Sequence, residues 1–80
     1  MPKTLYSGRH KVLVECLVAY RKRAGMTQTE LAKRLGLFQS KIAVMEAGGR
    51  RIDLIELLTI ADILEFDIDE LIGKVRAAAD

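Results

Sequence analysis

Three consecutive polar residues, Gln39, Ser40 and Lys41, carry side chains that can read the edges of DNA base pairs. A glutamine amide can bond adenine through two atoms, a lysine ammonium can donate to guanine, and a serine hydroxyl can serve several bases. A helix fits the major groove of B-DNA, and residues at its N-terminal end reach the base edges. In isolation these residues are more typical of a solvated helix face than of a DNA contact, so the surrounding elements must decide.

Two short helices are predicted on either side of Gly36, over 28–35 and about 39–47. Thr27 and Glu30 fit a capping box at the start of the first: Thr27 accepts from the amide of Glu30, whose carboxylate reaches back to Thr27. Their inward-facing residues are expected to be Leu31, Ala32, Leu35, Ile42 and Met45. Two short helices joined by a tight turn are the layout of a helix-turn-helix.

Three further helices are predicted, over about 9–24, from Asp53 to Leu64, and from about Asp69. Apolar residues recur at spacings of three and four in each, and glycines mark several of the ends. The first of them has one apolar stripe, made of Leu13, Leu17, Tyr20 and Ala24. The second has an expected core face, made of Leu54, Leu57, Leu58, Ala61 and Leu64, and the last carries Leu71, Ile72 and Val75. With its only proline at position 2 and no Asn-Gly hairpin signal, the chain is predicted to be all-α with five helices.

The length of 80 residues indicates one domain over 1–80, with 1–8 as a flexible N-terminal arm and 77–80 as a frayed tail. Cys16 and His10 are the only cysteine and histidine, and they cannot build a metal site alone. We expect Cys16 to be buried and His10 to face solvent. No catalytic set, cofactor or apolar run of ~18 residues is recognisable, so we expect a cytoplasmic, non-enzymatic protein outside the membrane.

Charge is divided unevenly along the chain. Residues 9–51 hold ten basic and three acidic side chains, whereas 52–80 hold two basic and eight acidic ones. One interpretation is a basic face for a polyanion with an acidic region turned away from it. The alternative is a solvated surface whose charges are segregated by chance.

The pattern over residues 20–71 resembles the helix-turn-helix family of the phage Cro and cI repressors and their bacterial (XRE-like) relatives. The matching stretches are 21–32, 35–37, 39–42, 46–48, 57–64 and 69–71. They cover about two-thirds of the chain, and their combination is specific where any single one is only suggestive. The resemblance implies a compact five-helix, lambda-repressor-like DNA-binding domain.

The same resemblance implies roles by position. Gln39, Ser40, Lys41 and Val44 would face the groove, and Gln28 would contact a phosphate and pack against Gln39. Arg21 would pair with Glu46 and be presented towards phosphate. Arg50 and Arg51 would meet the DNA backbone or the edge of the minor groove, against the alternative of a solubilising loop. The residues implied in structural support are Thr27, Glu30 and Glu46.

Two positions depart from the family pattern. Phe38 stands where a Ser or Thr cap is usual, so the second short helix lacks about 1 kcal/mol of side-chain capping. Phe38 would pack on the protein or press on the sugar-phosphate surface. Ala47 replaces the usual Asn, which removes one polar backbone contact. Base reading would be narrow, with Val44 touching a thymine methyl group.

The second half of the chain is more apolar than a five-helix core of this length requires. We expect a homodimer interface at Phe66, Ile68, Ile72 and Val75, against the alternative that the last helix packs over them. The predicted function is therefore sequence-specific binding of double-stranded DNA by a dimeric transcription regulator, of repressor or controller type, on a near-palindromic operator. The alternative is an antitoxin or other protein-interaction module, with a toxin or RNA polymerase as the partner.

Overall fold

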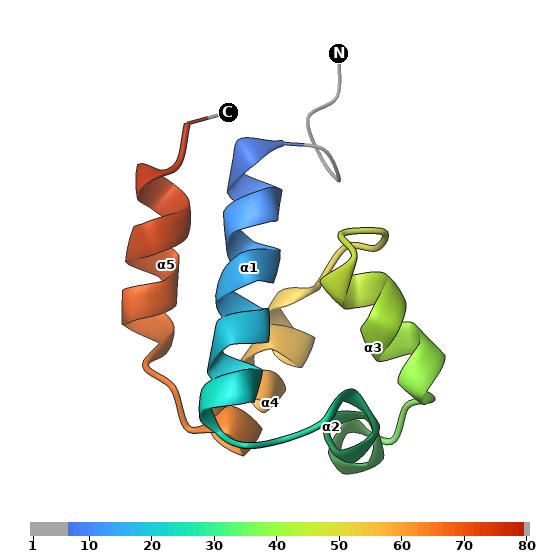
Figure 1. Ribbon diagram of the computed structural model, residues 1–80. Helices are drawn as coiled ribbons and strands as arrows, with labels where there is room; N and C mark the ends of the chain where they lie inside the picture. Colours follow the sequence, from blue (N-terminus) through green and yellow to red (C-terminus); the bar gives the residue numbers. More distant parts are fainter. Residues whose placement is uncertain (1–6, 80) are drawn as a thin grey trace.

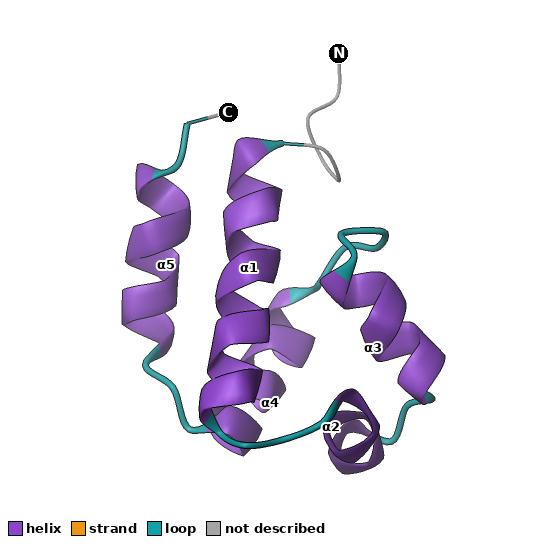
Figure 2. Cartoon of the chain, in the orientation of Figure 1, coloured by secondary structure: helices purple, strands orange, loops and turns teal. Residues whose placement is uncertain are grey.

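The structure, a computed structural model, describes residues 7–79. This part of the chain forms five helices and no strand (Figures 1 and 2). They are α1 (Gly8–Arg23), α2 (Gln28–Leu35), α3 (Gln39–Glu46), α4 (Leu54–Leu64) and α5 (Ile68–Ala77). The all-α prediction is confirmed, and the helix bounds agree with it to within one or two residues. None of these helices has both the length and the apolarity needed to cross a bilayer.

The helices form two groups. α1 and α5 lie side by side, α4 passes behind α1, and α2 and α3 form a pair beside them (Figure 1). α1 also contacts α3, and α2 contacts α4, so the pair is held to the rest of the fold from two directions.

Side-chain caps set the start of four of the five described helices; the capping residues are Ser7, Thr27, Asp53 and Asp67. The capping box predicted for α2 is present: the Glu30 N–H donates to Thr27 Oγ1 and the Thr27 N–H donates to Glu30 Oε1, both at 3.1 Å. α3 begins at Phe38 without a side-chain cap, as expected.

The predicted N-terminal arm, residues 1–8, overlaps the folded domain at its last two positions. Ser7 accepts from the His10 N–H at 3.0 Å, and Gly8 already belongs to α1, so both are part of the folded domain. Positions 1–6 of the expected arm, and position 80 of the expected tail, lie outside the described residues. At the other end, α5 continues to Ala77.

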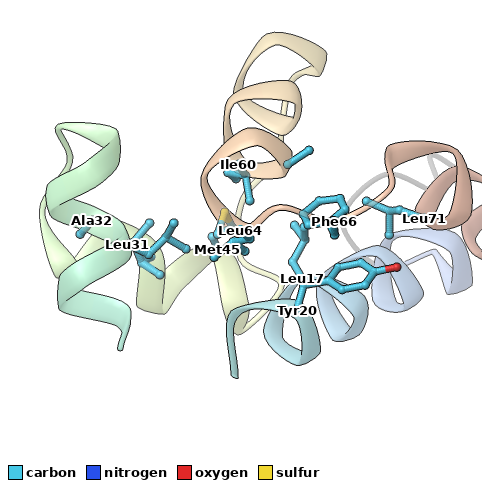
Figure 3. Packing of buried hydrophobic residues seen from close by; sticks show 11 residues of the cluster. Leu17, Tyr20, Leu31, Ala32, Met45, Ile60, Leu64, Phe66 and Leu71 are labelled. Carbon is cyan, nitrogen blue, oxygen red and sulfur yellow. The ribbon is translucent and has the colours of Figure 1, made fainter. Parts of the chain in front are cut away.

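One hydrophobic core draws on all five helices (Figure 3). Its buried residues are Leu17, Tyr20, Leu31, Ala32, Ile42, Met45, Ile60, Ala61, Leu64, Phe66 and Leu71. Ile42, Ile60 and Leu71 have no exposed surface. Because the two short helices contribute to this same core, their mutual orientation depends on the packing of the whole domain.

The predicted core face of α4 is wrong in part. Leu54 is 62 % exposed and Leu58 is 42 % exposed, whereas Ile60 is fully buried. The first turns of α4 are apolar over much of the helix circumference. The spacing of the apolar residues alone therefore does not show which side of the helix faces the core. Packing against the other helices selects the arc that contains Ile60, Ala61 and Leu64.

Phe66 belongs to the core and not to the predicted dimer interface. Glu65 ends α4 with a left-handed φ of 55°, and the chain then turns Phe66 inward. The Phe66 ring stacks on Tyr20 with centroids 4.2 Å apart (Figure 3). Of the other expected interface residues, Ile68 and Val75 are partly buried against the core, and Ile72 remains exposed.

The expected positions of His10 and Cys16 are also corrected. His10 is buried, because it lies in the first turn of α1 beside Ala47 and Gly48, which follow α3. Cys16 is only half-buried and packs against the edge of the core.

Tyr20 joins α1 to α5 through its hydroxyl, which donates to Glu70 Oε1 at 2.7 Å. Burial and this hydrogen bond raise the pKa of Tyr20 to about 12. The same hydrogen bond, with the charge of Lys74, lowers the pKa of Glu70 below its ordinary value.

Replacing Tyr20 with phenylalanine is expected to lower the free energy of unfolding by about 1 kcal/mol near pH 8, the worth of an ordinary hydrogen bond. An unfolded tyrosine loses its proton near pH 10, whereas Tyr20 keeps it to about pH 12. The wild-type advantage is therefore complete below about pH 10 and disappears as the pH rises to about 12. Urea titrations of both proteins at pH 8 and at higher pH measure this. A difference that is constant with pH would contradict the role of the hydroxyl.

Candidate nucleic-acid interface

α2 and α3 are joined by a turn that requires glycine. Gly36 closes α2 in the left-handed conformation, with φ of 71°. The Leu37 N–H then donates to the Ala32 carbonyl at 2.9 Å, which ends the helix and redirects the chain into α3. Ile42 and Met45 bury one side of α3 in the core, and the opposite side faces outward. The helix-turn-helix prediction is confirmed.

A buried ion pair holds α3 to α1. The Arg21 guanidinium donates from Nε to Glu46 Oε2 at 2.6 Å and from Nη2 to Glu46 Oε1 at 2.9 Å. The Arg21 and Glu46 side chains are only 10 % and 8 % exposed. The hydrogen bonds to Glu46 raise the pKa of Arg21 above its ordinary value. The predicted pair is thereby confirmed.

Little of Arg21 is exposed for the expected contact with phosphate. Besides its two bonds to Glu46, Arg21 donates from Nη1 to the Met26 carbonyl at 2.8 Å. Its side chain is therefore buried, and its charge is matched by a carboxylate within the fold. Arg21 fixes the end of α1, the start of the α1–α2 loop and the end of α3 relative to one another.

The ion pair continues into a chain of hydrogen bonds that reaches the outer face of α3. Gln28 Nε2 donates to Glu46 Oε1 at 2.9 Å, and Gln39 Nε2 donates to Gln28 Oε1 at 2.8 Å. The predicted contact between Gln28 and Gln39 is confirmed. The bond from Gln28 to Glu46 was not foreseen, because it joins residues of different helices and no local sequence signal marks it.

The donors and acceptors along this chain of hydrogen bonds can point in only one direction, because the Glu46 carboxylate can only accept. Gln28 must turn its amide nitrogen to Glu46 and its carbonyl to Gln39. Gln39 then uses one N–H inward and keeps its carbonyl oxygen and its second N–H free. A free acceptor beside a free donor is the pair that adenine N6 and N7 require in the major groove.

The remaining predicted groove residues lie on the exposed side of α3. Ser40 and Lys41 are exposed, and Val44 is 48 % exposed. Together with Arg50 they line a shallow hollow. Gly49 keeps the following loop close to this surface, since a Cβ there would lie 3.0 Å from Val44 Cγ1.

The two loop arginines differ in their surroundings. Arg50 Nη1 lies 3.2 Å from Glu56 Oε1, and both side chains are partly buried, so this pair ties the loop to the start of α4. Arg51 is exposed. The guanidinium of Arg50 is thus paired with a carboxylate of the protein, and Arg51 is the more exposed of the two.

Phe38 does not pack on the protein. Its side chain is 78 % exposed at the first turn of α3, next to Gln39. Of the two expectations for Phe38, packing on the protein is wrong, and only a ring that faces outward is compatible with the structure.

Comparison with known proteins agrees with this geometry. The family model described as "Helix-turn-helix" matches residues 17–71, which include the whole hydrogen-bond chain from Arg21 to Gln39. The chain belongs to this helix-turn-helix family. The match extends from the second half of α1 to Leu71, so it covers most of the core as well as the α2–α3 pair.

Solved structures give the same assignment. An XRE-family like protein from Pseudomonas syringae pv. tomato is 38 % identical, with a TM-score of 0.77 over 86 % of this chain and 84 % of that one. A structure of the clp gene regulator ClgR from C. glutamicum also has a TM-score of 0.77, over 90 % of this chain and 92 % of the chain in that structure. At 17 % identity, that likeness shows a shared fold. No curated protein sequence matches the chain. The chain is an XRE-type, DNA-binding helix-turn-helix protein.

Proposed function

We propose that the chain binds specific double-stranded DNA sites with α3 in the major groove and regulates transcription from them. The observation that carries this proposal is the hydrogen-bond chain from Glu46 through Gln28 to Gln39. It leaves Gln39 with one free acceptor and one free donor on the exposed side of a helix-turn-helix. A surface glutamine with no function has no need of such orientation.

The other predicted contacts surround Gln39. Ser40 and Lys41 would bond base edges, and Val44 would touch a thymine methyl group. Arg51 would contact phosphate, and Gln28 would do so through its remaining N–H. The excess of basic over acidic side chains in residues 9–51 would supply attraction to DNA that does not depend on sequence.

We further propose that two copies bind a near-palindromic operator as a homodimer of repressor or controller type, in the cytoplasm. Exposed apolar side chains support the dimer: Leu54, Ile55, Leu58 and Ile72 are all at least 41 % exposed. Of the residues expected at the interface, Ile72 is exposed, and the first turns of α4 would take the place of the buried Phe66. A two-fold dimer would present two α3 helices to half-sites about one helical turn apart.

The same apolar surface favours a second candidate, an antitoxin or other module that binds a protein through α4 and α5. In that case DNA binding would be secondary, and a protein partner such as a toxin or RNA polymerase would cover these side chains.

Selection of bound duplexes from a random library, followed by sequencing, tests the proposal. Enrichment of a near-palindrome supports a dimeric, sequence-specific regulator. Enrichment of a single half-site would support sequence-specific DNA binding and contradict the proposed dimer. If folded protein at low salt enriches nothing, the protein-interaction module becomes the better account.

Replacing Gln39 and Arg51 separately with alanine is expected to have different effects. Gln39→Ala should lose discrimination at one base pair, by about 1–3 kcal/mol. Arg51→Ala should weaken all duplexes alike and reduce the dependence of affinity on salt by about one phosphate contact. Binding titrations on the selected site, on single-base variants and at several salt concentrations separate the two. Equal losses on every duplex for both variants would contradict these roles.

A further inference from the structure

Phe38 is exposed where the fold gives no reason for an aromatic side chain. It is the most exposed of the large hydrophobic residues described, at 78 %, and it occupies the capping position of α3 without forming a cap. A Ser or Thr there would remove the exposed ring and supply the missing hydrogen bond. Phe38 therefore gives α3 no side-chain cap and leaves a large apolar ring in contact with water. Residues that break a local rule in this manner are concentrated at functional sites.

The surroundings of Phe38 indicate what would cover it. Leu37, just before it, turns inward against the core, and Gln39, just after it, lies on the proposed reading surface. The nearest charges along the chain, Lys33, Arg34 and Lys41, are all basic and exposed. The exposed apolar residues of α4 and α5 lie on other elements of the fold. A polyanion therefore fits this ring better than a basic or apolar protein surface does.

We propose that Phe38 is a specificity residue that contacts the C5-methyl group of a thymine beside the base pair read by Gln39. This inference rests on the proposed DNA binding. The thymine methyl is the apolar group in the major groove, and phenylalanine is among the side chains that contact it. Consecutive residues are about 3.8 Å apart and stacked base pairs about 3.4 Å apart, so the neighbouring base pair is within reach of Phe38.

The test compares thymine with uracil, which differs from it only by the missing methyl group. Each thymine of the selected site is replaced singly by uracil, and affinities are measured for wild type, Phe38→Ser and Val44→Ala. Wild type should bind roughly fourfold more weakly when the thymine next to the Gln39 base pair is replaced, since one methyl group leaves an apolar contact. Phe38→Ser should not distinguish the two bases there, and Val44→Ala should still do so.

The Phe38→Ser variant also provides its own folding control. Because a serine hydroxyl at this position can cap α3, the variant should be at least as stable to heat as wild type. A loss of thymine discrimination therefore cannot be attributed to unfolding.

Four results would overturn the proposal. Phe38→Ser could weaken thymine and uracil duplexes equally, which would indicate a sugar-phosphate contact. It could leave affinity unchanged, which would indicate no contact. Wild type could select a site yet bind it with the same affinity after every thymine-to-uracil replacement. That result would reject the contact with a thymine methyl group and leave the proposed DNA binding in place. If wild type selects no duplex at all, both the methyl contact and the proposed function are rejected.

Discussion

Replacing Glu46 with alanine is expected to lower the free energy of unfolding by about 3–5 kcal/mol, because it leaves the Arg21 cation buried without its partner. The Arg21 side chain is 10 % exposed, so water cannot readily replace the lost carboxylate. Gln28 loses its acceptor in the same substitution. Denaturation by urea or heat measures the loss of stability.

Lys74→Ala is the matched control for this prediction. Lys74 pairs with Glu70 at 3.5 Å, but both side chains are about half exposed. Breaking that pair should cost no more than about 1 kcal/mol. If Glu46→Ala lowers the free energy of unfolding as little as Lys74→Ala does, burial of the ion pair does not increase its contribution to stability.

A double variant separates stability from DNA reading. Arg21→Met with Glu46→Leu removes both charges, and such apolar replacements of buried pairs are often neutral or stabilising. We expect its stability to lie near that of wild type. Without the Glu46 carboxylate, however, Gln28 and Gln39 have no fixed polarity, and discrimination at the Gln39 base pair should fall. A double variant that is stable and fully specific would show that Gln39 needs no such orientation.

Replacing Ile42 with alanine is expected to lower the free energy of unfolding by about 2–5 kcal/mol. Ile42 has no exposed surface and anchors the buried side of α3. Its loss removes apolar contacts and leaves a cavity between α3 and the rest of the core. For a domain of this size, that cost is a large share of the total stability.

Val44→Ala, on the opposite side of the same helix, is the control for Ile42. Val44 is 48 % exposed, so its removal should change stability by less than about 1 kcal/mol while altering DNA recognition. Urea unfolding of both variants measures the contrast. Similar losses of stability for the two variants would mean that α3 is not anchored by Ile42.

The local features of this protein were determined by the sequence itself. The Thr27–Glu30 capping box, the left-handed Gly36 and the uncapped start at Phe38 all depend on residues at most a few positions apart. Such interactions need no knowledge of the rest of the fold, since helix ends are satisfied by their own neighbours. The positions of α2 and α3 could therefore be predicted closely.

The site was predictable in part, and by a different route. The pairs Arg21–Glu46 and Gln28–Gln39 were implied by resemblance to a family, because each joins residues far apart in sequence. The bond from Gln28 to Glu46, which unites the two pairs and orients Gln39, emerged only when four side chains on three helices were placed together.

Tertiary structure alone decided which apolar and charged residues remain available to partners. It turned Phe66 inward onto Tyr20, left Leu54 exposed on α4, and paired Arg50 with Glu56. The physical reason is that spacing identifies apolar arcs on a helix but not which arc another helix will cover. Burial and long-range pairing depend on packing among all five helices, whereas helix starts and turns depend on the few residues that form them.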